Sequence, residues 1–118
     1  MAYTTGNKIG ETGADNVLAG TYPPAKVVAV DITAGDVIER GTLLSREDDG
    51  TYVTLGSGSG EAAAVMAQTT TEDDVIAEVY ISGCFYRQKM IVADDYEITD
   101  DDEFNLQKNG PILLTDAL

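Results

Sequence analysis

The chain has 118 residues and carries 7 Lys or Arg against 21 Asp or Glu, which gives a formal net charge of −14. This excess argues against direct binding to nucleic acid, because the phosphates would repel it, and it suits a basic protein partner. The chain has no His and a single Cys, so the commonest general base and an internal disulfide are both excluded. No apolar run approaches the roughly 18 residues of a membrane span, and we find no signal-peptide core near the N-terminus. We expect one domain that is made in a reducing cytoplasm.

The first part of the chain predicts an arm rather than part of a core. Residues 1 to about 21 are polar, with dispersed glycines, and bury too little apolar surface to offset their ordering entropy. Pro23-Pro24 then favours an extended path. We expect a flexible arm over residues 1–24 and a β-rich domain over residues 25–118. The aliphatic residues of the arm beyond Met1 are Ile9, Val17 and Leu18.

Three strands are expected before residue 60. They span residues 26–32, residues 37–44 with an interruption at Gly41, and residues 51–55. Asp49-Gly50 predicts a hairpin turn before the third strand, because such turns need residues with positive φ. Residues 56–60 are rich in Gly and Ser and predict a flexible loop. This loop is not a phosphate loop, because no Lys-Ser/Thr pair follows it.

Residues 61–68 leave two interpretations open. Their Ala-rich composition favours a helix by intrinsic propensity. Their neighbours are expected strands, and small residues suit a tightly packed strand. We favour the strand.

Residues 74–87 form the longest run of β-branched and aromatic residues and predict the central strand. Residues 75, 77, 79 and 81 are apolar and share one face, and residues 78, 80 and 82 share the other. On this alternation we expect Ile81 in the core and Tyr80 near the surface or at a subunit contact. Gly83 predicts a bulge or a close approach of another backbone. Cys84 is expected to be a small buried hydrophobe.

The end of the chain predicts a strand, a helix and a closing strand. Residues 89–93 are expected to be a strand and residues 94–97 a loop. Thr99 is the expected N-cap of a helix with acidic residues in its first turn, and Gly110-Pro111 ends that helix. Residues 112–115 close the fold. The predicted fold class is mostly β, in a compact single domain with one short C-terminal helix.

The search for chemistry yields no catalytic, cofactor-binding or metal site. The acidic run at residues 100–103 lacks the spacing of a calcium loop. The serines and Cys84 have no His partner. A pair of acids for glycoside hydrolysis stays an open alternative, since acids distant in sequence can meet in space. The residues alone indicate a binding or structural module and leave its ligand open.

Several segments together resemble the lambda-type phage head decoration proteins. They are Gly41-Thr-Leu-Leu followed by Asp49-Gly-Thr-Tyr, Ala62-Ala-Ala-Val-Met-Ala, Val79-Tyr-Ile-Ser-Gly-Cys-Phe followed by Lys89-Met-Ile-Val, and Asn109-Gly-Pro-Ile-Leu-Leu. The resemblance covers roughly residues 26–118 and lies in order and spacing rather than in one motif. Two departures are the Gly/Ser-rich residues 56–60 and Pro111, which stands where a hydrogen-bonding residue is expected.

The resemblance implies a homotrimer of β-tulip-like protomers on the outer surface of a phage capsid, assembled into the virion after synthesis in the host bacterium. Its trimers occupy three-fold and quasi-three-fold sites of the expanded head and cement the shell, without catalysis, cofactor or membrane. The implied partner is the major capsid protein, to which the N-terminal arm adds a strand. The arm residues expected at this contact are Thr4, Thr5, Ile9, Val17 and Leu18. The competing interpretations are a small carbohydrate- or peptide-binding β module and a hydrolase with paired acids.

Overall fold

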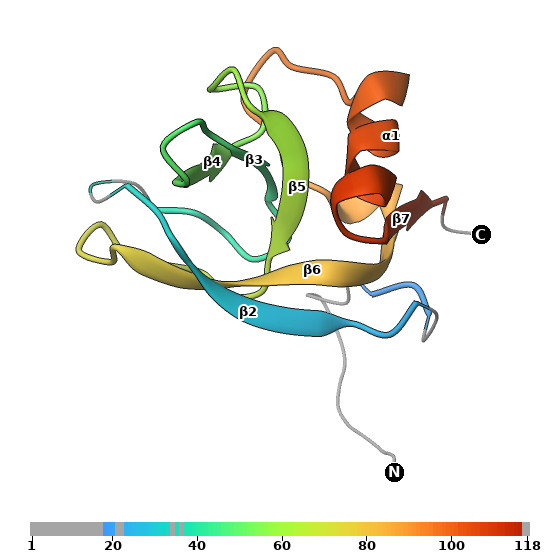
Figure 1. Cartoon of the computed structure of the whole chain (residues 1–118), viewed down its shortest axis with the longest axis horizontal. Helices are drawn as coiled ribbons and strands as arrows, with labels where there is room; N and C mark the ends of the chain where they lie inside the picture. Colours follow the sequence, from blue (N-terminus) through green and yellow to red (C-terminus); the bar gives the residue numbers. More distant parts are fainter. Residues whose placement is uncertain (1–17, 21–22, 34, 36, 117–118) are drawn as a thin grey trace, which may run out of the picture.

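The computed structural model describes residues 18–20, 23–33, 35 and 37–116, and it is mostly β with one short helix, as predicted. Figure 1 shows the helix packed beside one part of the sheet. The elements in chain order are β2 (Lys26–Asp31), β3 (Leu43–Arg46), β4 (Tyr52–Thr54), β5 (Glu61–Met66), β6 (Ile76–Tyr86), a single 3₁₀ turn (Arg87–Lys89), α1 (Asp100–Asn109) and β7 (Ile112–Thr115).

The strands form a six-stranded sheet in the order β2-β6-β5-β3-β4, with β7 pairing with β6 off this path. The pairs along the path are antiparallel, whereas β7 runs parallel to β6. An isolated bridge between Ile32 and Tyr52 connects the two ends of the path, so the sheet curls towards closure (Figure 1). This curl gives the sheet an inner and an outer face.

Strand β6 is the centre of the fold, and it changes partners at Gly83. Residues before Gly83 pair with β2 and β5, and the residues from Gly83 to Tyr86 pair with β7. The φ of Gly83 is +145°, and a Cβ there would lie 2.9 Å from Cζ of Phe85. A side chain is therefore excluded twice, by backbone conformation and by space. The contact that excludes a side chain comes from the Phe85 ring and not, as was expected, from another backbone, because Cα of Ala25 would lie at an ordinary contact distance of 3.6 Å.

Two hydrophobic clusters lie on opposite faces of the sheet. Neighbouring residues of one strand, such as Val79 and Tyr80, belong to different clusters, because successive side chains point to opposite faces. The outer cluster includes Leu106 of α1, so the helix covers this face. The outer cluster consists of Leu43, Leu55, Ala62, Val65, Tyr80, Phe85, Leu106 and Ile112. The inner cluster consists of Ile32, Ile38, Leu44, Ala64, Met66, Ala77 and Val79.

The predicted faces of β6 hold, with Ala77 and Val79 buried in the inner cluster, but the expected surface position of Tyr80 is wrong. Tyr80 is 8% exposed and belongs to the outer cluster, whereas Ile81 is only partly buried and packs against the inner cluster. Val75, expected in the core, is 54% exposed and lies just before the strand. The prediction assumed a strand with one buried face, but the middle of β6 is buried on both.

Two further strand predictions are wrong in extent. Residues 37–40 are not a strand, and β3 begins only at Leu43, after Gly41 with φ of +92° has turned the chain. Residues 89–93 form no strand either: a 3₁₀ turn ends at Lys89, and Ile91 makes only an isolated bridge with Thr42. In both segments the prediction of a strand rested on apolar residues, but neither segment pairs with a neighbour as a strand does.

The ambiguous segment and the helix follow the predictions. Residues Glu61–Met66 form β5, and every residue from Ala62 to Met66 is buried. The side chain of Thr99 accepts a hydrogen bond from the N–H of Asp102 at 3.1 Å, and the Asp102 carboxylate accepts one from the N–H of Thr99 at 2.9 Å. This reciprocal capping box begins α1, and Gly110 ends it.

Candidate interaction surface

The described chain begins beside the second half of β6. Leu18 forms an antiparallel bridge with Phe85, and the N–H of Ala19 donates to the C=O of Cys84 at 2.8 Å. Leu18 is partly buried and packs against the outer cluster. The predicted arm was drawn to residue 24, but Leu18 and Ala19 are attached to the body. The attachment places Leu18, the first described residue, beside the second half of β6.

The structure places one of the five predicted arm contacts. Leu18 lies in the bridge just described, facing the body rather than a partner surface. Thr4, Thr5, Ile9 and Val17 lie outside the described residues. Their expected role at a partner surface stays a prediction.

Arg87 joins three segments near this attachment point. Its Nε and Nη2 atoms donate to the two carboxylate oxygens of Glu103 on α1, at 3.1 and 2.7 Å. It also pairs with Asp116 after β7 and donates to the C=O of Leu114. The hydrogen bonds with Glu103, and then those with Asp116, raise the pKa of the Arg87 guanidinium above its ordinary value. Arg87 thus fixes the end of β6 to the helix and to the last strand.

The helix start is tied to the loop that precedes it. Asp102 is only 8% exposed, and its carboxylate accepts hydrogen bonds from the Thr99 N–H and from the Tyr96 hydroxyl. The bond from Tyr96 to Asp102, followed by burial, raises the pKa of the Tyr96 hydroxyl above its ordinary value of 10.0. The protonated hydroxyl is therefore the form that the fold stabilises.

Replacing Tyr96 with Phe should change how stability depends on alkaline pH. Because the folded pKa of Tyr96 is raised, its contribution is complete below the unfolded value of about 10 and is lost as pH rises through the folded value. We expect Tyr96→Phe to lower the free energy of unfolding by about 1 kcal/mol at neutral pH, and the two curves to converge above about pH 10. Urea unfolding across this range measures both quantities. A constant offset at every pH would contradict this role, and Tyr86→Phe, on β6, is the matched control.

The Gly/Ser-rich loop is built around a carboxylate. The N–H groups of Ser59 and Gly60 donate to the two carboxylate oxygens of Glu47 at 3.2 and 3.0 Å. A Cβ at Gly60 would lie 2.0 Å from the backbone oxygen of Arg46. The loop therefore already holds an anionic group from its own chain, and its glycines are needed for close packing.

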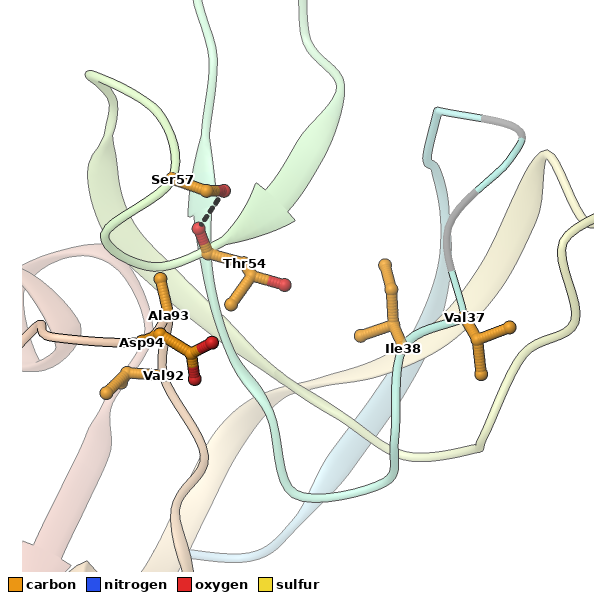
Figure 2. A pocket seen from close by; sticks show the side chains of 7 residues that line it. All are labelled: Val37, Ile38, Thr54, Ser57, Val92, Ala93 and Asp94. Carbon is orange, nitrogen blue, oxygen red and sulfur yellow. Dashed lines mark hydrogen bonds between the residues drawn. The ribbon is translucent and has the colours of Figure 1, made fainter.

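An open depression of 440 Å³ is lined by the segment before β3, the end of β4 with the loop after it, and residues 92–94 (Figure 2). Asp94 is the only residue of its lining with an ionisable side chain, and the Ser57 hydroxyl donates to the C=O of Thr54 at 2.6 Å. The lining residues are Val37, Ile38, Thr54, Ser57, Val92, Ala93 and Asp94. The lining of the depression holds one carboxylate, whereas glycoside hydrolysis uses a pair.

The described residues offer no further concentrated chemistry. Among them, no three His, Cys, Asp or Glu side chains are grouped so as to hold a metal ion. Within the same ranges, no helix is both long and apolar enough to cross a bilayer. Cys84, expected to be partly or fully buried, is partly buried and is a free thiol. The described surface offers negative charge, exposed strand edges and the attachment of Leu18 to β6.

Comparison with known protein families and with curated proteins finds no match for this chain.

The sequence pointed to some of these features and not to others. The N-cap at Thr99 followed from the local pattern, whereas the reciprocal bond to Asp102 was not predicted. The role of Arg87 was missed, because Glu103 and Asp116 are distant in sequence and nothing local indicates their meeting. The exposed edge of β2 was also missed, although its Val-rich pattern without a Pro between Lys26 and Asp31 is a signal for an unprotected edge.

Proposed function

We propose that this chain is a phage head decoration protein, which binds as a homotrimer to three-fold and quasi-three-fold sites of an expanded capsid and cements it. The observation that carries the proposal is where the resembling segments lie. They contribute to β3, β5, β6 and β7, which are neighbours in the sheet: β5 pairs with β3 and β6, and β7 pairs with β6. Most of the resembling residues thus lie in the connected centre of the fold, whereas residues 49–51 and 89–92 lie outside its strands.

Two further features support the proposal. The segment before Leu18 starts from a main-chain bridge at the end of β6, which is a suitable base for a strand that pairs with a neighbouring protein. The net charge of −14 suits a partner that is basic where it is contacted. In this proposal the major capsid protein is that partner, and residues 1–17 are the docking element. The protein works on the outside of the virion and carries out no reaction.

The proposed trimer has a direct test in solution. Sedimentation equilibrium at several protein concentrations should give a mass about three times the 12.5 kDa of the chain. The cementing role has a separate test on isolated expanded heads of the cognate phage. Added protein should raise the temperature at which the heads come apart, because a ligand that binds only the intact state stabilises it. A monomer that leaves head stability unchanged would contradict the proposal.

A further inference from the structure

The outer edge of β2 points main-chain groups away from the sheet. Ala29 stands opposite Glu78 in the antiparallel pair of β2 with β6. Both main-chain groups of Glu78 are engaged elsewhere, since its N–H donates to Oε1 of Gln68 at 2.8 Å and its C=O accepts from the N–H of Ala67 at 3.0 Å. Ala29 and Glu78 therefore form a non-hydrogen-bonded pair. In such a pair the N–H and C=O of Ala29 point away from β6.

The same alternation applies to Val27, which pairs with Tyr80 in the same register as Ala29 with Glu78. Strand β2 is the end of the strand path. Within the part of the chain that the structure describes, neither Val27 nor Ala29 makes a main-chain hydrogen bond to an element other than β6. The bridge of Ile32 with Tyr52 marks the point where β4 approaches. The open edge therefore runs over residues 27–30.

The side chains beside this edge are apolar and acidic. Val28 and Val30 pack against the inner cluster, so residues 27, 29 and 31 lie on the outer face, and all three are exposed. Their outer-face neighbours on β6 include Ile76 and Glu78, which are exposed too. Val27 is 45% exposed and Ile76 is 57% exposed. Figure 1 shows that α1 sits over the other part of the sheet and leaves this end of β2 and β6 uncovered.

We propose that the edge of β2 docks an extended segment of another protein in which apolar and basic side chains alternate. The segment would pair its main chain with Val27 and Ala29 and place its basic side chains on the outer face, towards Asp31 and Glu78. Its apolar side chains would then lie on the other face, beside Val28 and Val30. Asp31 and Glu78 outnumber the one exposed cation of the strand, Lys26, which lies at its start. The net charge of −14 attracts such a segment. This site belongs to the folded body and does not rest on the proposed function.

A titration of the full-length ¹⁵N-labelled protein tests the chemistry of the ligand. One probe is a short peptide of alternating Lys and Val, and the other has Glu in place of each Lys. We expect the Lys–Val peptide to shift the amide resonances of residues 27–31 saturably, with an affinity that falls as salt rises. The Glu–Val peptide should leave them unchanged. Equal effects of the two peptides, or shifts confined to another surface, would overturn the proposal.

Matched charge variants test the place of the site. Ala29→Lys puts a cation on the outer face of β2, and Gln107→Lys makes the same charge change at an exposed position of α1. We expect Ala29→Lys to weaken Lys–Val binding about tenfold or more, and Gln107→Lys to bind like the native chain. Ala29→Pro removes an N–H that β6 does not use, so it should also weaken binding while the fold persists. Equal binding by the two Lys variants, or dimerisation of the native protein that Ala29→Lys abolishes, would overturn the proposal.

Discussion

Replacing Phe85 with Ala should lower the free energy of unfolding by about 3–5 kcal/mol, a large share of the roughly 5–15 kcal/mol of a typical domain. Phe85 is fully buried, and its ring centroid lies 5.3 Å from that of Tyr80. Its backbone pairs with Leu18 on one strand and Leu114 on another. The truncation therefore opens a cavity where the start of the described chain, β6 and β7 meet.

The other phenylalanine of the chain is a matched control. Phe104 lies on α1 and is 62% exposed, with Lys108 placed over its ring. Phe104→Ala removes the same atoms but leaves no cavity, so we expect a change within about 0.5 kcal/mol. Urea denaturation of both variants gives the two values. Similar losses in the two variants would mean that the outer cluster is not the core of the fold.

Deleting residues 2–17 should leave the body folded and weaken binding to expanded heads by about tenfold or more, which corresponds to about 1.4 kcal/mol or more. The deletion ends before Leu18, because Leu18 packs against the outer cluster and Ala19 is hydrogen-bonded to Cys84. A longer deletion of residues 2–20 removes these contacts as well and should also lower stability. Unfolding and head binding of both truncated proteins, measured side by side, separate the two roles.

Two results of these deletions would contradict the prediction. If the shorter deletion binds heads as tightly as the full chain, residues 2–17 are not the docking element. If it unfolds, those residues are part of the body. Leu18→Ala in the full chain is the control for the attachment, and it should lower stability without removing the segment that docks.

The sequence predicted local features of this fold better than it predicted its pairing. Thr99 and the acidic residues after it signalled the helix start, and Gly83 signalled an irregular position in β6, because these effects act over a few residues. The strand at Glu61–Met66 was preferred over a helix because of its expected neighbours. Such features carry their physical cause within the segment itself.

The misassignments have a common physical origin. Tyr80 was placed near the surface because alternation distinguishes the two faces only when one face is exposed, and both faces are buried at Val79 and Tyr80. Residues 89–93 were read as a strand because their apolar content is typical of one. Met90 and Val92 are partly buried because they pack against the outer cluster and not because they belong to a strand. Tertiary contacts decided these positions, and no local pattern contains them.

The candidate surface was predictable only in part. Its negative charge is a property of composition, and the N-terminal segment was singled out by its lack of apolar residues. The open edge of β2 depends on strand order, since the same Val-rich segment in the middle of a sheet would have no free main-chain groups. Strand order follows from contacts between residues far apart in sequence.

Co-sedimentation with heads of the cognate phage tests the central claim most directly. The full-length protein is mixed with expanded heads and, separately, with unexpanded heads, and the pelleted protein is measured over a range of concentrations. We predict saturable binding to expanded heads, at a stoichiometry of one trimer for each three-fold and quasi-three-fold site, and little binding to unexpanded ones. Absence of saturable binding to expanded heads, at concentrations where the protein is folded, would contradict the assignment as a decoration protein.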